Sequence, residues 1–193
     1  MKIQKIFRIM HYGIMAILVI PHYFAFLISP QRDIIIEDIH ANMKEKNVNF
    51  LTFLFVMDNK WFRNLFYYRI GWISIFIKWY LPQDKTFIID TKSILGGAKI
   101  THPFATIIHA KYIGKNFSVR NCTTIGNKKD GRNDLIPTIG DNVTVGANCC
   151  LIGNIKIGNN VTIGAGSVVV KDIPDNTIVV GNPSRIINSD LII

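Results

Sequence analysis

The stretch that decides the fold is TIGDNVTVGANCCLIGNIKIGNNVTIGAGSVVV, residues 138–170, in which one six-residue pattern is repeated. An aliphatic residue opens each repeat, and glycine often follows it, as in Ile139-Gly140 and Ile163-Gly164. Four positions after the aliphatic residue stands a small or apolar side chain such as Val143. The same spacing continues upstream, so the aliphatic series is Ile113, Val119, Ile125, Ile139, Val145, Leu151, Ile157, Ile163 and Val169. This regularity indicates a series of equivalent short strands.

A period of six residues predicts a triangular coil of parallel strands. Each repeat supplies one strand whose aliphatic side chain points inward, and glycine or asparagine turns the corner, where a positive φ is often needed. Three repeats complete one turn. A β-sandwich would not keep so strict a spacing, so we expect a parallel β-helix over residues 86–193 that ends in a short C-terminal tail.

The repeat loses its phase at two places. Fourteen positions separate Ile125 from Ile139, and residues 128–134 between them are polar with a central glycine, so we expect a loop that protrudes from the coil. Upstream, Ile94 and Ile100 form a repeat that is one residue out of step with Ile113. Irregular backbone in a regular coil is where a functional site is expected, which directs attention to residues 102–109.

Residues 1–85 differ in composition and are expected to form a separate helical region, which makes the chain an α+β protein. They contain all three tryptophans and most of the phenylalanines. Helices are predicted from Ser29-Pro30 to about Lys46, over 50–57, and from about Lys60 to Tyr80. The last helix would carry an aromatic stripe made of Trp61, Leu65, Tyr68, Trp72, Ile75 and Trp79. We expect this stripe to face the helical core or an oligomer contact, with a membrane or lipid-linked-substrate surface as the alternative.

An apolar segment lies near the start of the helical region. Met10 to Ile28 has no formal charge and is close to the ~20 residues that cross a bilayer. Basic residues precede it, so a crossing would keep the N-terminus in the cytoplasm and carry the rest of the chain outside. Pro21 also interrupts the run. An interfacial or re-entrant helix is therefore favoured, with a helix buried in an oligomer and a true span left open.

The net charge of +9 is shared by both halves of the chain. A mildly basic surface suits an anionic cofactor, a sugar nucleotide or an acidic lipid surface. No motif that reads DNA or RNA is present, so we expect no nucleic-acid partner.

Several motifs point to one family. They are ILGG at 94–97, THPFATIIH at 101–109, TTIG at 123–126, PTIGDNV at 137–143, IGAGSVV at 163–169 and VGNPSR at 180–185, with RNLFYYR at 63–69 in the helical region. Together they resemble the serine acetyltransferase branch of the hexapeptide acyltransferases, and more closely its relatives associated with capsule and exopolysaccharide synthesis. The resemblance implies a left-handed coil, a homotrimer with a dimer of trimers left open, and an acetyl-CoA groove between adjacent coils. No metal cofactor is expected.

His102 matches the catalytic histidine of that family. The resemblance implies that it acts as the general base: its imidazole takes a proton from the acceptor hydroxyl, which attacks the thioester carbonyl directly. In serine acetyltransferases an aspartate orients this histidine, but Phe87 stands at the ungapped position here. Asp90 is the nearest candidate for that role, and a backbone carbonyl is the alternative.

The resemblance also implies binding residues. Coenzyme A would contact Gly126, Ala147 and Ala165, where its slender arm must approach the main chain. Lys171 and Arg185 would meet its phosphates, with plain surface charge as the alternative. His109 and Arg132 are candidates for contacting the acceptor, with a corner or interface role for His109 and a solvated loop position for Arg132 as the alternatives.

The residues just before Pro137 depart from the resemblance, and they bear on the acceptor. Serine acetyltransferases carry an Arg-His pair just before the position of Pro137, whereas Leu135 and Ile136 stand here. A site without that arginine has lost its obvious partner for a carboxylate, so a sugar hydroxyl on a monomeric, nucleotide-linked or lipid-linked sugar fits better than serine. We therefore expect an O-acetyltransferase of surface polysaccharide synthesis that works in the cytoplasm or peripherally on the inner face of the membrane.

Three alternatives remain. The first is a serine O-acetyltransferase, and the second is an N-acetyltransferase for a nucleotide-linked amino sugar. The third is a non-catalytic or zinc-binding coil, which is disfavoured because such zinc sites need three converging histidines and the coil has only His102 and His109.

Overall fold

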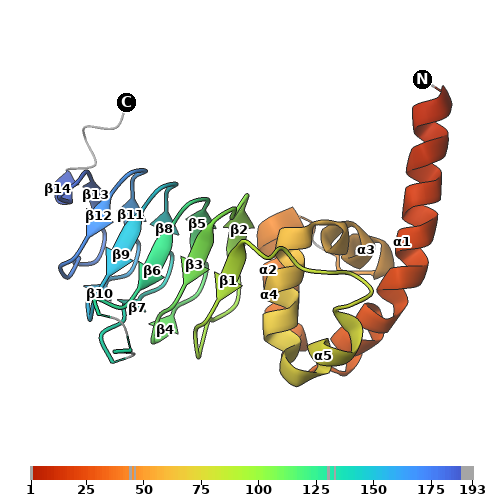
Figure 1. Cartoon of the computed structure of the whole chain (residues 1–193), viewed down its shortest axis with the longest axis horizontal. Helices are drawn as coiled ribbons and strands as arrows, with labels where there is room; N and C mark the ends of the chain where they lie inside the picture. Colours follow the sequence, from red (N-terminus) through yellow and green to blue (C-terminus); the bar gives the residue numbers. More distant parts are fainter. Residues whose placement is uncertain (1, 44, 46, 130, 133, 188–193) are drawn as a thin grey trace. The chain divides into compact units, whose positions relative to one another are not determined.

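The computed structural model describes residues 2–43, 45, 47–129, 131–132 and 134–187, and it divides into two compact units, Met1–Asp84 and Lys85–Ile193 (Figure 1). The first unit is built of helices and the second of short, mostly parallel strands. The α+β class predicted from the change in composition is confirmed.

The helical unit contains α1 (Lys2–Ile28), α2 (Arg32–Met43), α3 (Phe50–Asp58), α4 (Lys60–Ile70), the 3-10 helix η1 (Gly71–Ile73) and α5 (Ser74–Ile77). α1 continues through Pro21, although a proline removes one backbone hydrogen bond from a helix. Packing offsets that loss, because Val19, His22 and Phe26 on either side of Pro21 are fully buried. α2 ends at Met43, earlier than predicted; residues 44 and 46 lie outside the described residues.

The core of the helical unit is aromatic. Phe26, Phe53 and Phe66 are fully buried, with ring centroids 5.1 Å apart for the first pair and 5.4 Å for the second. A buried ion pair lies in the same unit, where Arg69 Nε donates to Asp38 Oδ2 at 2.8 Å. Such a pair contributes little net stability when intact but is costly to break, because either partner alone would be a buried, uncompensated charge.

The predicted long helix over residues 60–80 is wrong. α4 ends at Ile70. The next residue, Gly71, has a φ of 57°, in the left-handed region that favours glycine, and the chain then turns through η1 into α5. The break turns the second half of the predicted stripe outward: Trp72 and Trp79 are 72% and 68% exposed, whereas Leu65 is fully buried as expected. The buried face of α4 is formed instead by residues such as Phe62 and Phe66, so Trp72, Ile75 and Trp79 do not belong to the core of this unit.

The second unit is a triangular parallel β-helix (Figure 1). Its first side consists of β1 (Phe87–Ile89), β3 (Thr106–Ile108), β6 (Thr124–Gly126), β9 (Cys150–Ile152) and β12 (Val168–Val169). Its second side consists of β4 (Tyr112–Ile113), β7 (Thr138–Ile139) and β10 (Lys156–Ile157). Its third side consists of β2 (Lys99–Thr101), β5 (Ser118–Arg120), β8 (Thr144–Val145), β11 (Thr162–Ile163), β13 (Ile178–Val180) and β14 (Arg185–Ile187). The pairs are parallel except β13 with β14, an antiparallel closure that the repeat did not predict.

The register confirms the inward aliphatic series. Ile113 pairs with Ile139 and Val119 with Val145, and these four side chains are fully buried. The upstream phase break is resolved in the same way, since Ile100 pairs with Val119 and Ile108 with Ile125. Ile100 and Ile108 are eight positions apart, whereas their partners Val119 and Ile125 are six positions apart. The extra residues therefore lie between β2 and β3. The loop between β6 and β7 protrudes as predicted, and residues 188–193 of the predicted tail lie outside the described residues.

Asparagine rather than glycine supplies the positive φ at the corner between the second and third sides. Asn142, Asn160 and Asn176 have φ between 54° and 57°, and their side chains are joined by hydrogen bonds of 2.8–2.9 Å into a ladder that begins at Asn116. Glycine has a different role there. A Cβ on Gly140 would lie 2.8 Å from the carbonyl oxygen of Gly158 in the next turn, so this glycine permits close approach of two backbones.

Candidate active site

His102 lies on the edge of the coil where the chain passes from the third side to the first. It follows β2, its φ is 48°, and its side chain is exposed. Ala105, just before β3, has a φ of 49°, so two residues other than glycine adopt left-handed backbone within one turn. Such backbone is uncommon outside glycine, asparagine and aspartate and is enriched at functional sites. The sequence therefore builds a bend at the predicted position of the catalytic histidine.

The successive turns of the coil stack along this edge, which we call the His102 edge (residues 102–105, 121–122, 147–148 and 165–166). The Cys122 amide donates to the Phe104 carbonyl at 2.8 Å, and the Asn148 and Gly166 amides donate to the turns above them in the same way. Turns of a β-helix are about 4.8 Å apart, so Ala147 and Ala165 lie about 10 and 14 Å below His102 along one line. The small side chains of Ala147 and Ala165 leave this line uncovered on the second and third turns below the histidine.

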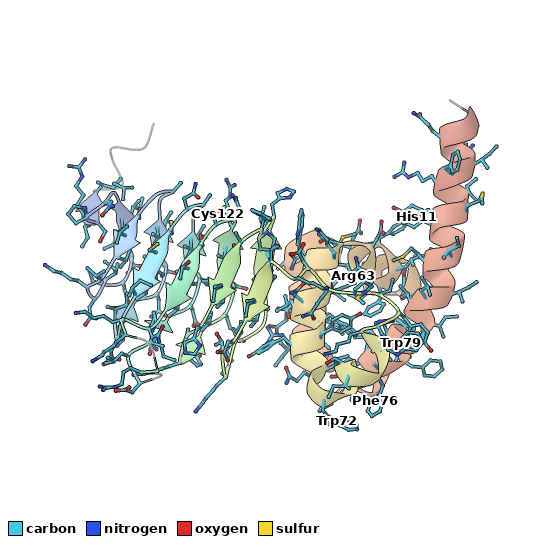
Figure 2. The ribbon with its side chains drawn as sticks, viewed as in Figure 1. His11, Arg63, Trp72, Phe76, Trp79 and Cys122 are labelled. Carbon is cyan, nitrogen blue, oxygen red and sulfur yellow. The ribbon has the colours of Figure 1, made fainter. Side chains whose placement is uncertain are left out.

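Cys122 is the residue of this edge that sequence reasoning missed (Figure 2). Its thiol is free and partly exposed, and its φ is 56°. Its position could have been found by counting one full turn back from Asn148, that is three hexads and the eight extra residues of the protruding loop.

The remaining predicted cofactor residues lie elsewhere. Gly126 ends β6, and Lys171 follows β12, so both lie where the chain passes from the first side to the second. Arg185 is exposed and belongs to β14 at the end of the third side. A Cβ on Gly126 would meet no atom within 4 Å, so packing within one chain does not require glycine there, and the space in front of it is open.

Asp90 is paired with His109 rather than with His102. His109 Nδ1 lies 2.7 Å from Asp90 Oδ2. The prediction that Asp90 orients His102 is therefore corrected: Asp90 follows β1 and His109 follows β3, whereas His102 precedes β3 at the other end of the first side. Phe87, at the position of the family's aspartate, is 2% exposed.

A groove of about 530 Å³ opens beside this pair, on what we call the His109 edge (residues 90–92, 109–111, 126–129, 131–132, 134–137, 153–155 and 170–172). Its lining is Asp90, Thr91, Lys92, His109, Ala110, Lys111 and Ile136. His109 Nε2 is buried and has no hydrogen-bond partner among the described residues. Buried polar atoms are usually paired, so an unpaired one beside a groove marks a place where a partner from outside the chain would fit.

The protruding loop belongs to the same edge. Arg132 donates from Nε and Nη2 to the carboxylate of Asp134 at 2.8 and 2.7 Å, and this hydrogen bonding lowers the pKa of Asp134 to about 2. An anionic acceptor would have to compete with Asp134 for Arg132. Ile136 is 7% exposed and contributes an apolar wall to the groove.

Among the described residues, no group of three or more His, Cys, Asp or Glu side chains is arranged to hold a metal ion.

Comparison with known proteins identifies relatives of the coil. The family model described as bacterial transferase hexapeptide (six repeats) matches residues 136–171. Serine acetyltransferase 3 of Arabidopsis thaliana is 44% identical over 92 residues, which are 47% of this chain and 24% of that protein. The putative colanic acid biosynthesis acetyltransferase WcaB of Escherichia coli K12 is 44% identical over 88 residues, 45% of this chain and 54% of that protein. The chain thus spans between about a quarter and about half of these curated relatives.

Solved structures extend the likeness to the helical region. The serine acetyltransferase of Neisseria gonorrhoeae in complex with serine superposes with a TM-score of 0.68 at 26% identity, covering 87% of this chain and 73% of that one. The Brucella abortus enzyme in complex with coenzyme A shares the fold, with a TM-score of 0.57 at 23% identity, covering 87% of this chain and 72% of that one. Residues 136–171 thus match the hexapeptide-repeat transferase model, and the coil is similar to serine acetyltransferases and to WcaB.

Proposed function

We propose that this protein is an acetyl-CoA-dependent O-acetyltransferase that acts on a sugar hydroxyl in the synthesis of a surface polysaccharide. The observation that carries the proposal is the His102 edge, where an exposed histidine in a strained bend stands above a line of small residues. A narrow pantetheine arm needs such a line in order to lie close to the main chain, and the thioester must end beside the base.

A complete site would need two copies of the chain. The first side carries outward-facing Ile88 and Ile107, both more than 40% exposed, whereas β2 and β5 of the third side carry exposed Lys99 and Arg120. Three coils that meet through their first sides would bring the His102 edge of one copy to the His109 edge of the next, because these edges border the same side. Gly126 and Lys171 would then face Ala147 and Ala165 across each interface, which supports the homotrimer.

In this arrangement His102 acts as the general base. Its imidazole accepts the proton of the acceptor hydroxyl while the oxygen forms a bond to the thioester carbonyl carbon. When the carbon–sulfur bond breaks, the imidazolium returns that proton to the departing thiolate, so an acetyl ester and free coenzyme A are released. Backbone N–H groups at the bend would hold the oxyanion that forms between these two steps.

The lining of the groove on the His109 edge favours a sugar as the acceptor. When Nδ1–H of His109 donates to Asp90, Nε2 of the same ring can still bind a hydroxyl. The apolar side chain of Ile136 has no group that could bind a carboxylate. A sugar, with many hydroxyl groups and apolar ring faces, matches this lining better than the zwitterion of serine does. Lys92 and Lys111 at the rim would suit the phosphates of a nucleotide-linked or lipid-linked sugar.

Serine acetylation is the second candidate, and the relatives favour it, since two of the proteins compared above are serine acetyltransferases that share 44% and 26% of their matched residues with this chain. The two candidates differ in the acceptor but not in the base. Both would be carried out in the cytoplasm, where acetyl-CoA is made.

The test is release of thiol from acetyl-CoA by the purified full-length protein. The acceptors are L-serine, free sugars, nucleotide-linked sugars, a nucleotide-linked amino sugar and extracted lipid-linked oligosaccharide. We expect release with a sugar acceptor and its loss in His102→Ala, with His11→Ala as the control because His11 lies in the helical unit. Release with serine alone would show that serine, and not a sugar, is the acceptor. Full activity in His102→Ala would refute the assignment of His102 as the general base.

A further inference from the structure

α1 has two apolar faces, and only one of them is buried. Met15, Val19 and Phe26 pack into the helical unit and are at most 7% exposed. The opposite face is apolar along the whole helix, and Ile9, Ile17 and Phe24 on it are 64%, 70% and 64% exposed. The members of this outward stripe are Ile6, Ile9, Met10, Ile17, Ile20, Phe24, Leu27 and Ile28. Their spacing of three, four and seven residues keeps them on one side of the helix over about 33 Å.

A second exposed group, the aromatic cluster, consists of Trp72, Ile75, Phe76, Trp79 and Tyr80. Trp72 packs edge-on against Phe76 at 6.1 Å between ring centroids, and Trp79 Nε1 donates to the Phe76 carbonyl at 2.9 Å. Figure 2 shows Trp72, Phe76 and Trp79 together at the end of the helical unit where α1 finishes, so the cluster lies near the C-terminal end of the stripe.

The chemistry of these two groups favours lipid over protein as their partner. α1 contains no acidic residue, Lys5 and Arg8 are exposed near its start, and the exposed Lys78 lies beside Trp79 in the cluster. Positive charge at both ends of an apolar stripe complements the negative headgroups of an anionic bilayer. Tryptophan and tyrosine also favour the boundary between headgroups and hydrocarbon, where an apolar ring and a polar tip are both satisfied.

The packing of α1 argues against a crossing of the bilayer by this helix. α1 is long and apolar enough to be a candidate span by length and composition, over Gln4–Ile28. From Met15 onward, however, one face of α1 is occupied by its own unit. The part before Met15 is about 13 residues or about 20 Å long, short of the ~30 Å of hydrocarbon, and it includes Lys5 and Arg8.

We propose that the outward stripe of α1 and the aromatic cluster form a membrane-docking surface that lies in the interface of an anionic bilayer. The stripe enters the boundary between headgroups and acyl chains along its length, and the tryptophans anchor its C-terminal end. This inference does not depend on acetyl transfer, because every residue that carries it belongs to the helical unit.

The test is flotation of the full-length protein with vesicles of phosphatidylcholine alone or of phosphatidylcholine mixed with phosphatidylglycerol. We expect the wild type to float with the mixed vesicles and to float more weakly with phosphatidylcholine alone. The variants Ile17→Gln/Phe24→Gln and Trp72→Gln/Trp79→Gln should each lower the partition coefficient at least about tenfold, since each removes two large apolar side chains from the lipid. Leu51→Gln is the matched control, because Leu51 is 60% exposed on α3 and outside the proposed surface; glutamine keeps the helix propensity high.

Two results would overturn the proposal. One is equal loss of flotation in Leu51→Gln and in the surface variants, which would mean general destabilisation; far-UV circular dichroism of each variant checks this. The other is a wild type that does not float but sediments as an assembly that becomes smaller in Ile17→Gln/Phe24→Gln. The stripe would then be covered by a second copy of the chain.

Discussion

Replacing Gly140 by alanine is expected to destabilise the coil, whereas the same substitution at Gly126 is not. A Cβ on Gly140 would lie 2.6 Å from Asn159 Oδ1 and 2.8 Å from the carbonyl oxygen of Gly158. The carbonyl belongs to the backbone of the next turn, which is held by the pairing of β7 with β10, so it cannot simply rotate away. Overpacking of this kind lowers the free energy of unfolding by about 1–3 kcal/mol. Alanine has less conformational freedom than glycine in the unfolded chain, which raises the free energy of unfolding by about 0.4–1 kcal/mol. The net loss should be about 1–2 kcal/mol.

Differential scanning calorimetry of the full-length protein is the appropriate assay, because it can resolve the transitions of the two units. For a unit of this size the expected loss lowers Tm by roughly 4–15 °C. Gly126→Ala is the control: its φ is not positive and its Cβ would meet no atom within 4 Å, so Tm should stay the same or rise slightly. Equal Tm values for the two variants would refute the account of why glycine follows the aliphatic residue.

Three further predictions concern other sites. Asp38→Asn should destabilise the helical unit by about 3–5 kcal/mol in guanidinium unfolding, because the buried guanidinium of Arg69 loses its counter-charge; a change below about 1 kcal/mol would contradict this. Burial lowers the pKa of His22 below its unfolded value of about 6.5, so the unfolded chain binds more protons as the pH falls. The free energy of unfolding should therefore decrease between pH 7.5 and pH 5, and His22→Gln should abolish this pH dependence. An unchanged pH dependence in the variant would assign it to other groups. Asp90→Asn should raise the KM for the acceptor more than it lowers kcat in steady-state assays, because the His109 ring loses its 2.7 Å partner, whereas wild-type kinetics would remove His109 from the acceptor site.

The coil was predictable because its signal is local and repeated. An aliphatic residue every six positions fixes both the strand and the side that faces inward, so the burial of Ile139, Val145 and Leu151 follows from the sequence alone. The bend at His102 was also visible, as a break in that spacing.

The helical unit was harder to predict, because its packing depends on partners distant in the chain. The 3,4 spacing from Trp61 to Trp79 describes one face of an unbroken helix, and a single positive φ at Gly71 invalidates it. The pairing of Asp90 with His109 has a similar cause. Which side chains meet depends on the stacking of β1 on β3, and the sequence contains no direct sign of that register.

The asparagine ladder also has a consequence for how this coil can change. An insertion within the ladder would break side-chain hydrogen bonds in two neighbouring turns and would force another residue type into left-handed backbone. The ladder therefore fixes the register of successive turns at this corner. Changes in length are confined to the two edges that border the first side. Those edges carry the bend at His102 and the loop around Arg132, so both segments can vary in length without disturbing the fold that supports them.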